Sequence, residues 1–383
     1  MARNPFRPTF GASPPLLVGR QELIDEFELG LIEGPGAPTR ATVYTGLRGV
    51  GKTAMLNAVR DVALEQGWVV VPETLTPGFS ARIVTEHLPR LLQRLDSKAQ
   101  RHITAVTAPF SLGGMAWETV ENHPVGVGLR TEIEDLSGLV EGGILFTLDE
   151  LHRRRSPELS IFCAEIQHAF REDLPVAFAG AGLPNAVDVL LAGDEGPVTF
   201  LRRAKRPALG SVDLEDVMAA LRQPIEAGGR RIGDEALRRA AEATRDPQGA
   251  GGYPFLVQLV GYHAWNQSRA REEISLEDVE RGVEVARRKL GSQVLGPALS
   301  DLSPVERSFL LAMARDDGPS KMREVGERLG VDRSYASQYR LRLIAASVIA
   351  TTGRGLVDFT LPHMREHLRS HAAFAADLHT PAE

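Results

Sequence analysis

The sequence predicts an α/β fold in its first half, with a parallel sheet between layers of helices. Short β-rich runs alternate with amphipathic helical stretches from Leu17 to about Leu209, which is the pattern of a layered α/β domain. A glycine-rich segment lies between one of these runs and a helix-forming stretch. From about Val212 the pattern is helical and broken by Gly and Pro, so we expect no further strands before Val294.

Five β-rich runs are the expected strands of this sheet: Ala41–Thr45, Trp68–Pro72, Gly143–Leu148, Pro175–Ala179 and Pro207–Leu209. A long insertion separates the second run from the third. It begins with apolar residues at helical spacing from Ile83 to Leu95, which predicts a helix. Residues 104–130 follow and are rich in Gly and Thr; we interpret them as a β-hairpin. Residues 1–16, rich in Pro, Arg and Ser, predict an extended arm.

Length and composition indicate a protein of several domains. A chain of 383 residues predicts two or three of them. No run approaches the roughly 20 apolar residues of a membrane span, and the N-terminus has no apolar stretch of signal-peptide type. The single cysteine, Cys163, excludes an internal disulfide and fits a reducing compartment. We therefore expect a cytoplasmic protein without membrane contacts.

The expected domain boundaries follow breaks in these patterns. The run LGPALSDLSP separates the helical region from a compact C-terminal unit, and no internal repeat is evident. We predict an arm, an α/β core, a helical lid domain, a winged helix-turn-helix and a tail at residues 1–16, 17–210, 211–295, 300–372 and 373–383, respectively.

The segment GLRGVGKT matches the phosphate-binding pattern G-x-x-x-x-G-K-[ST] at every fixed position. The β-rich run ATVYT precedes it and a helical stretch follows. The alternative is a Gly-rich turn with an incidental surface lysine, which would not need to lie between a strand and a helix. The backbone N–H groups and the helix N-terminus would bind phosphates. Lys52 would neutralise the β- and γ-phosphates, and Thr53 would contribute its hydroxyl to Mg²⁺. The predicted binding residues are Gly46, Leu47, Arg48, Gly49, Val50, Gly51, Lys52, Thr53 and Ala54.

A second part of this site is expected in GGILFTLDE, where an apolar run leads to Asp149 and Glu150. Ligands gather at the carboxyl ends of parallel strands, and both acidic residues follow such an end. Asp149 would hold Mg²⁺, and Glu150 would act as the general base for an attacking water. The alternative is a solvated acidic turn, which the glycine loop about a hundred residues earlier makes less favourable.

These motifs together resemble the AAA+/STAND superfamily of P-loop ATPases, especially archaeal-type and origin-recognition-like ATPases with a C-terminal winged helix. The resemblance rests on LVGR, GLRGVGKT, TLDELH and PVAFAGAGLP, in this order. It implies a P-loop NTPase core of AAA+-like α/β type with a helical lid, and ATP with Mg²⁺ as cofactors. It also implies that Val18, Gly19 and Arg20 lie against the adenine ring.

The resemblance implies further roles at two places. Arg202 and Arg203 precede the fifth strand, where relatives carry an arginine that reaches the γ-phosphate of a neighbouring subunit. The alternative is a basic helix end facing water. Tyr253 and Pro254, in GGYPF, resemble the element that opens a lid helix and touches the nucleotide, although Pro is natural at a first helical turn.

The sequence departs from the family pattern at the end of the fourth strand. Relatives place Asn, Thr or Ser there to sense the γ-phosphate, whereas this chain has small residues around Ala181. A small apolar side chain cannot orient the attacking water. This departure favours slow hydrolysis and a switch over a motor.

The C-terminal residues predict a winged helix-turn-helix. Ser303 and Glu306 form a capping sequence at the start of one helix, and a second helix ends at Gly330. A third is expected at Arg333–Ile344, followed by two β-rich runs around the tip Gly353–Gly355. The order of helix, helix, turn, helix and hairpin is typical of this module.

If this unit binds DNA, the third helix and the hairpin tip would make the contacts. The candidates are Arg333, Ser334, Tyr335, Ser337 and Gln338 for the major groove, Arg340 and Arg342 for phosphates, and Arg354 for the minor groove. The net charge of −6 provides no general attraction to DNA. Residues 301–383 contain 11 basic and 11 acidic residues, so protein docking is the alternative role of this unit.

Two functions follow from these expectations. The first is an ATP-hydrolysing switch that couples nucleotide state to binding of double-stranded DNA. The second is a scaffold with slow or no hydrolysis, in which the C-terminal unit docks a protein partner or another copy of the chain. A GTPase is disfavoured because no Asn-Lys-x-Asp motif occurs, and a thiolate zinc site because there is one cysteine. No G-x-S-x-G motif of serine hydrolases occurs either.

Overall fold

The computed structural model describes residues 3–9, 11–95, 125–151, 157–191 and 199–375. Most of the segment for which the sequence suggested a hairpin lies outside these residues. Its last part belongs to a helix, α6 (Val125–Ser137). The predicted tail beyond residue 375 also lies outside the described residues.

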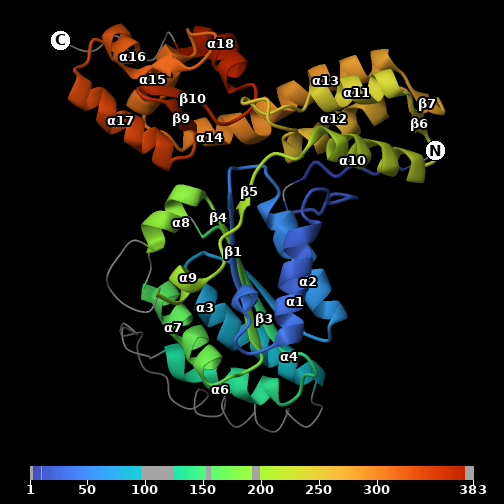
Figure 1. Cartoon of the computed structure of the whole chain (residues 1–383), viewed down its shortest axis with the longest axis vertical. Helices are drawn as coiled ribbons and strands as arrows, with labels where there is room; N and C mark the ends of the chain where they lie inside the picture. Colours follow the sequence, from blue (N-terminus) through green and yellow to red (C-terminus); the bar gives the residue numbers. More distant parts are fainter. Residues whose placement is uncertain (1–2, 10, 96–124, 152–156, 192–198, 376–383) are drawn as a thin grey trace, which may run out of the picture.

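A five-stranded parallel sheet forms the core of the first half (Figure 1). The spatial order is β2-β3-β4-β1-β5. The strands are β1 (Ala41–Gly46), β2 (Val69–Thr74), β3 (Ile144–Asp149), β4 (Val176–Gly182) and β5 (Ala208–Leu209). All five predicted runs are therefore strands, with ends displaced by at most three residues. Because the strands are parallel, their carboxyl ends lie at one edge, where Thr45 of β1 pairs with Gly182 of β4.

Helices cover both faces of the sheet, and alternate strand residues belong to two separate apolar clusters. Tyr44 and Leu145 pack in the cluster that includes α1 and α2, whereas Val43 and Phe146 pack in the cluster of α7. Cys163 is buried in α7, and this burial raises the pKa of its thiol to about 12. The helices are α1 (Gln21–Glu33), α2 (Lys52–Glu65), α7 (Pro157–Arg171), α8 (Pro184–Leu191) and α9 (Thr199–Arg203).

The helix predicted from Ile83 to Leu95 is present and begins earlier. Its parts are α3 (Phe79–Arg82), a π-helical turn η2 (Ile83–His87) and α4 (Leu88–Leu95). Buried Ile83, Leu88 and Leu92 lie on the face turned to the core.

Residues from Val212 to Ser300 are mainly helical, with α12 packed against α13. The expectation of no strands here was wrong, because β6 (Arg231–Ile232) and β7 (Glu273–Ile274) pair in parallel. Each has two residues, which is too short for an alternating pattern to show in the sequence. The helical elements are α10 (Leu214–Ala227), α11 (Asp234–Glu242), α12 (Pro254–Gln267), α13 (Leu276–Leu290), η4 (Gly291–Leu295) and α14 (Gly296–Ser300).

The C-terminal part has the helices and the hairpin in the predicted order. Ser303 caps α15 through a capping box with Glu306, and α16 ends at Gly330 with φ of 66°. Two elements were not predicted: β8, which pairs with β10, and α18. The elements are α15 (Pro304–Met313), β8 (Ser320–Lys321), α16 (Met322–Leu329), α17 (Arg333–Ala345), β9 (Ile349–Gly353), β10 (Leu356–Phe359) and α18 (Met364–Ala375).

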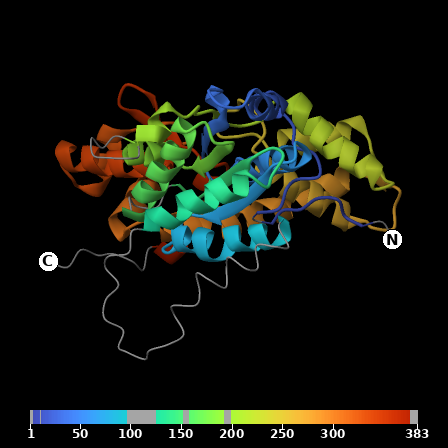
Figure 2. The same cartoon turned by 90° about the horizontal axis from the view of Figure 1, so that it is seen from below.

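The helical region and the C-terminal part lie side by side over one end of the sheet (Figure 1). Seen from below, they extend to opposite sides of the core (Figure 2). None of the helices within the described residues is long and apolar enough to span a membrane. The fold thus places three parts of the chain around the carboxyl edge of β1 and β3.

Candidate functional site

The glycine-rich loop connects β1 to α2 and adopts a conformation that glycine favours. Gly49 and Gly51 have φ of 74° and 93°, values that residues with a side chain rarely adopt. A Cβ on Gly49 would also lie 2.0 Å from the hydroxyl oxygen of Tyr253. Steric and backbone requirements therefore both select glycine at position 49.

Lys52 begins α2 and its side chain folds back over the loop. Its Nζ donates to the carbonyl oxygens of Gly46 at 3.0 Å and Leu47 at 2.8 Å. Burial lowers the pKa of Lys52 to about 8, although nearby Asp149 and Glu150 oppose this shift. The ammonium group is thus held at the loop in a poorly solvated position, where an anionic ligand would favour its charged form.

The acidic pair lies beside the loop, as the sequence predicted for the end of β3. The Thr53 hydroxyl donates to Asp149 Oδ2 at 2.6 Å, and the backbone N–H of Glu150 donates to Asp149 Oδ1 at 2.8 Å. Glu150 has φ of 63°, a left-handed conformation that is uncommon for glutamate and is found more often at functional sites. Thr53, Asp149 and Glu150 all line one pocket.

The start of α12 contacts the glycine loop, although it is about 200 residues away in the sequence. The Tyr253 hydroxyl donates to the Arg48 carbonyl oxygen, and the Phe255 N–H donates to the Gly49 carbonyl oxygen at 3.1 Å. Burial raises the pKa of Tyr253 above its ordinary value. Pro254 and Phe255 line the same pocket, so the GGYPF element forms part of its wall.

The LVGR segment forms another wall. Val18 and Arg20 line the pocket, whereas Gly19, with φ of 65°, packs against Val212. The Arg20 guanidinium donates to the carbonyl oxygen of Gly210. Burial lowers the pKa of Arg20, and the Asp216 carboxylate opposes this shift.

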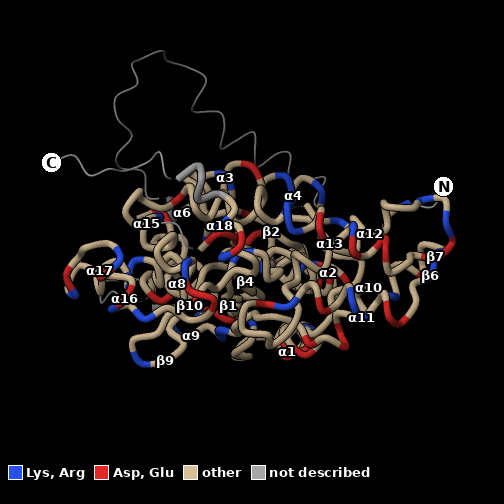
Figure 3. The backbone as a smooth tube through the Cα atoms, turned by 90° about the horizontal axis from the view of Figure 1, so that it is seen from above, with Lys and Arg blue, Asp and Glu red and all other residues tan. Residues whose placement is uncertain are grey.

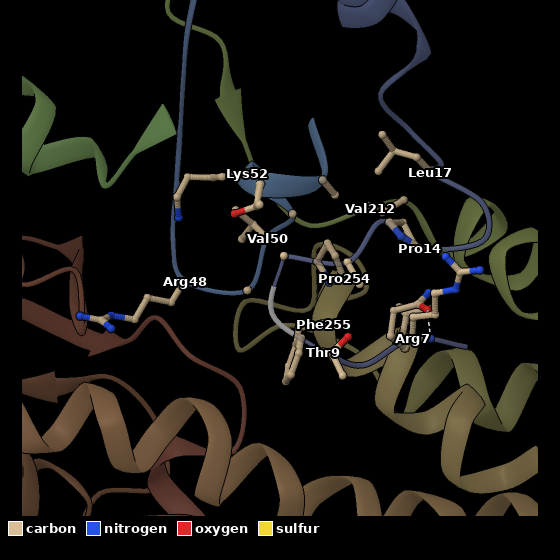
Figure 4. Close-up of a pocket in the computed structure, with 18 of the residues that line it drawn as sticks. Arg7, Thr9, Pro14, Leu17, Arg48, Val50, Lys52, Val212, Pro254 and Phe255 are labelled. Carbon is tan, nitrogen blue, oxygen red and sulfur yellow. Dashed lines mark hydrogen bonds between the residues drawn. The ribbon is translucent and has the colours of Figure 1, made fainter. Parts of the chain in front are cut away.

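The pocket has a volume of about 340 Å³, enough for a small organic ligand. Figure 4 shows Lys52 and Arg48 on one side of it and Arg7, Pro14 and Leu17 on the other. Of its charged lining residues in the described part of the chain, four are basic and two acidic, which favours an anionic ligand. They are Arg7, Arg20, Arg48, Lys52, Asp149 and Glu150.

Sequence reasoning missed two segments of the pocket wall. One is the N-terminal arm, and the other is the η4–α14 segment with Gln293, Val294 and Pro297. Gln293 Oε1 is buried without a hydrogen-bond partner among the residues that the structure describes. No local motif marks either segment, and the arm offers only two aromatic residues, Phe6 and Phe10, within a Pro-rich stretch.

The structure does not bring Arg202 and Arg203 to this pocket. Both lie exposed on α9, and the Arg202 Nε donates to the Leu191 carbonyl oxygen at 2.7 Å. Ala181 is buried within β4, where its carbonyl oxygen accepts from the Leu151 N–H. No polar side chain is therefore presented by residue 181.

The α17 candidates lie on an exposed surface of the helix. Arg333, Ser334, Tyr335, Ser337, Gln338 and Arg342 are exposed, Arg340 is half-buried, and Arg354 is exposed at the β9–β10 turn. The opposite face of the helix buries Ala336 and Leu343. The Arg342 guanidinium lies over the Tyr339 ring, 5.0 Å from its centroid. Figure 3 shows acidic and basic residues interspersed across this part of the molecule.

Comparison with solved structures identifies the architecture. The Walker-type ATPase of Pyrococcus abyssi is similar with a TM-score of 0.61 and 16% identity, over 92% of this chain and 96% of that chain. The chain shares the fold of P-loop ATPases. This likeness confirms the expected α/β core, and the low identity limits it to the fold.

Two further structures show weaker likenesses. The Cdc6p protein of Pyrobaculum aerophilum has a TM-score of 0.49 and 15% identity, over 97% of this chain and 96% of that chain. The ORC1 protein of Aeropyrum pernix, solved in complex with DNA, has a TM-score of 0.47 and 18% identity, over 97% of both chains. Residues 292–368 match a family model described as Domain of unknown function (DUF8462). No curated protein matches the chain.

Proposed function

We propose that this protein binds ATP with Mg²⁺, hydrolyses it slowly and uses the nucleotide state to position a C-terminal winged helix that binds double-stranded DNA. The observation that carries the proposal is the convergence of Lys52, Thr53, Asp149 and Glu150 on one pocket. Arg48 of the same loop extends from it to the start of the C-terminal part.

The oxygen atoms of Thr53 and Asp149 fit a magnesium ion. The two side chains already lie within 2.6 Å of one another, and hydroxyl and carboxylate oxygens are ligands that Mg²⁺ accepts. Bound there, the ion would neutralise charge on the phosphate oxygens. Lys52 would exchange its two carbonyl partners for phosphate oxygens, and the glycine-loop N–H groups would bind the remaining charge.

Hydrolysis in this proposal depends on Glu150, whose carboxylate lies at the pocket and would accept a proton from the attacking water. Ala181 offers no side chain to orient that water, so we propose that turnover is slow. Arg202 and Arg203 lie away from this pocket, and any role for them would be toward the site of a second copy of the chain.

Two contacts support coupling between the pocket and the C-terminal part. Arg48 forms an ion pair with Asp301 at 2.8 Å, directly before the capping box of α15. Asn185, which follows the end of β4, donates from its side chain to the carbonyl oxygen of Ile344 near the end of α17. A change at the loop would therefore reach the start of α15, and a change at the end of β4 would reach α17, the helix proposed to contact DNA.

Hydrolysis is tested by measuring phosphate release and ATP affinity for the wild type and Glu150→Gln. We expect turnover to fall at least a hundredfold in the variant because the general base is lost, while ATP still binds. Turnover that survives this substitution would overturn the role of Glu150. Glu158→Gln provides a control, since Glu158 caps α3 through the Gly78 and Ser80 N–H groups and does not line the pocket.

DNA binding is tested by fluorescence anisotropy with duplex DNA over a range of salt concentrations. We expect affinity to fall with salt and the slope to shrink by about one in Arg340→Ala. Arg323→Ala is a control of the same charge change, because Arg323 is exposed on α16 and is not among the predicted contacts. Equal DNA binding by the wild type and both variants at all salt concentrations would favour the protein-docking alternative. Leu341 on α17 also supports that alternative, because it is a large apolar residue that is 59% exposed.

A further inference from the structure

The N-terminal arm crosses the pocket between two anchors. At one end, Phe6 is buried against α12, where a Cβ on Gly261 would lie 2.4 Å from its ring. The Asn4 side chain donates to the carbonyl oxygen of Tyr262 on the same helix at 3.0 Å. A segment 258 residues away in sequence is thus fixed to the helical region by packing and by hydrogen bonding.

The second anchor lies on α2, the helix that carries Lys52 and Thr53. The side-chain amide of Asn57 donates to the Gly11 carbonyl oxygen at 3.1 Å and to the Ser13 hydroxyl at 3.2 Å. The arm therefore connects the phosphate-binding helix of the core to α12 of the helical region. Any ligand between these two helices would lie beneath it.

Between the anchors, the arm faces the pocket. Arg7, Thr9, Gly11, Ala12 and Pro14 line it. The backbone N–H of Arg7 donates to Gln258 Oε1 at 3.3 Å, which fixes the chain where the Arg7 side chain leaves it. The Arg7 side chain is exposed, and it lies across the pocket from Lys52 (Figure 4).

The chemistry of Arg7 suits the part of a nucleotide that the glycine loop does not hold. A guanidinium is planar and permanently charged, so it can stack on a nucleobase and donate to acceptor atoms. The neighbouring wall contains Pro14, Leu17 and Val18, which offer apolar contacts to a base. With phosphates at Lys52, the base and ribose would extend toward the arm.

We infer that residues 4–9 and 11–14 form a strap that is part of the nucleotide site, with Arg7 contacting the bound nucleotide at its base and ribose end. This inference rests on the proposed binding of ATP. The strap holds the nucleotide only while both anchors are intact, so Phe6 and Asn57 act through Arg7 as positioning residues.

The test is calorimetric titration of the full-length protein with ATP and Mg²⁺. We expect Arg7→Ala to weaken affinity about tenfold, which corresponds to about 1.4 kcal/mol. Arg3→Ala is the matched control, because Arg3 is exposed, carries the same charge and does not line the pocket. Equal affinity of the wild type, Arg7→Ala and Arg3→Ala would overturn the inference. An equal loss in both variants would also overturn it, because Arg7 would then act only through its positive charge and not through a contact with the nucleotide.

A double-mutant cycle separates the strap from a merely structural effect. If Phe6 positions Arg7, the loss in Phe6→Ala/Arg7→Ala should be smaller than the sum of the two single losses. Additive losses would show that Phe6 acts independently of Arg7. Asn57→Ala repeats the cycle from the other anchor and covers the case in which Phe6→Ala does not fold.

Hydrogen exchange provides a readout that does not depend on affinity. Addition of ATP should slow exchange of the amides of Phe6 and Arg7 if the nucleotide contacts the strap and stabilises it. Unchanged exchange at saturating ATP would contradict this contact. Failure of the wild type to bind ATP at all would instead overturn the proposed function.

Discussion

The glycine loop and α17 differ in what surrounds them, although both were marked clearly by the sequence. The loop is enclosed by β3, α12, LVGR and the arm, and its lysine is half-buried and hydrogen-bonded. The predicted contact residues of α17 lie mostly exposed, on a face that meets solvent. An enclosed site constrains its ligand by shape and charge together, whereas an open surface constrains its partner mainly by charge. We therefore expect substitutions at the loop to have large effects and those toward the C-terminal part to have small ones.

The largest effect is expected from Lys52→Ala. The variant lacks the cation that would contact the phosphates, so ATP affinity measured by calorimetry should fall at least a hundredfold, about 2.7 kcal/mol. Lys289→Ala, on the exposed face of α13, should bind as the wild type does. A loss below threefold in Lys52→Ala would show that the loop is not the phosphate site.

Gly49→Ala tests the enclosure of the loop by α12. Its positive φ and the contact with Tyr253 should together lower the free energy of unfolding by about 2 kcal/mol, measured in urea. Gly229→Ala is the matched control, since Gly229 has φ of 79° but open space around its Cβ position, and should cost less. Adding Tyr253→Phe to Gly49→Ala should restore part of the lost stability, because it removes the hydroxyl that the new Cβ would meet. Equal losses of stability in Gly49→Ala and Gly229→Ala would contradict the contact between Gly49 and Tyr253.

The poorly solvated position of the Lys52 ammonium group predicts a pH dependence of ATP binding and of stability. Its pKa of about 8 without ligand should rise when phosphates bind, so complex formation takes up a proton above pH 8. ATP affinity should be nearly constant below pH 8 and fall by up to tenfold per unit above it. Without ligand, the lowered pKa means that the unfolded chain binds more protons between pH 8 and about 10.5. The destabilising contribution of the charged Lys52 should therefore be relieved as pH rises through that window, so the free energy of unfolding should rise, and Lys52→Met should remove this pH dependence.

The smallest effect is expected where the glycine loop contacts the start of the C-terminal part. The Arg48–Asp301 pair is largely exposed, so Asp301→Asn should change the free energy of unfolding by less than about 1 kcal/mol. If the pair transmits nucleotide state, the ATP-dependent change in DNA affinity should shrink several-fold in Asp301→Asn and in Arg48→Ala. The double variant should be no worse than either single variant. Coupling that persists in all three would point to the Asn185 contact instead.

Contiguous patterns were the features that the sequence predicted well. The loop and the pair Asp149 and Glu150 each combine a motif with a flanking strand, so local composition was sufficient to find them. The five strands were found because buried parallel strands are continuous apolar runs. The capping box at Ser303 was equally local.

Features that depend on distant contacts were missed. The arm and Asn185 acquire their places through contacts across more than 100 residues, and Gln293 lines a pocket whose other walls are distant in the sequence. No spacing rule encodes such proximity. The pair β6 and β7 escaped detection because two residues cannot display a period. The assignments of Arg202, Arg203 and the α17 face remain predictions, since each would need a partner molecule.

The buried position of Cys163 allows labels to be placed selectively on introduced cysteines, so that movement in the proposed switch can be measured. Because its thiol is enclosed in α7 and has a pKa of about 12, it should resist labelling reagents at neutral pH. A cysteine introduced at exposed Leu64 on α2 and another at Arg354 would then be the reactive pair. Spin or fluorescent labels on them would report the distance between the core and the hairpin tip as nucleotide is added.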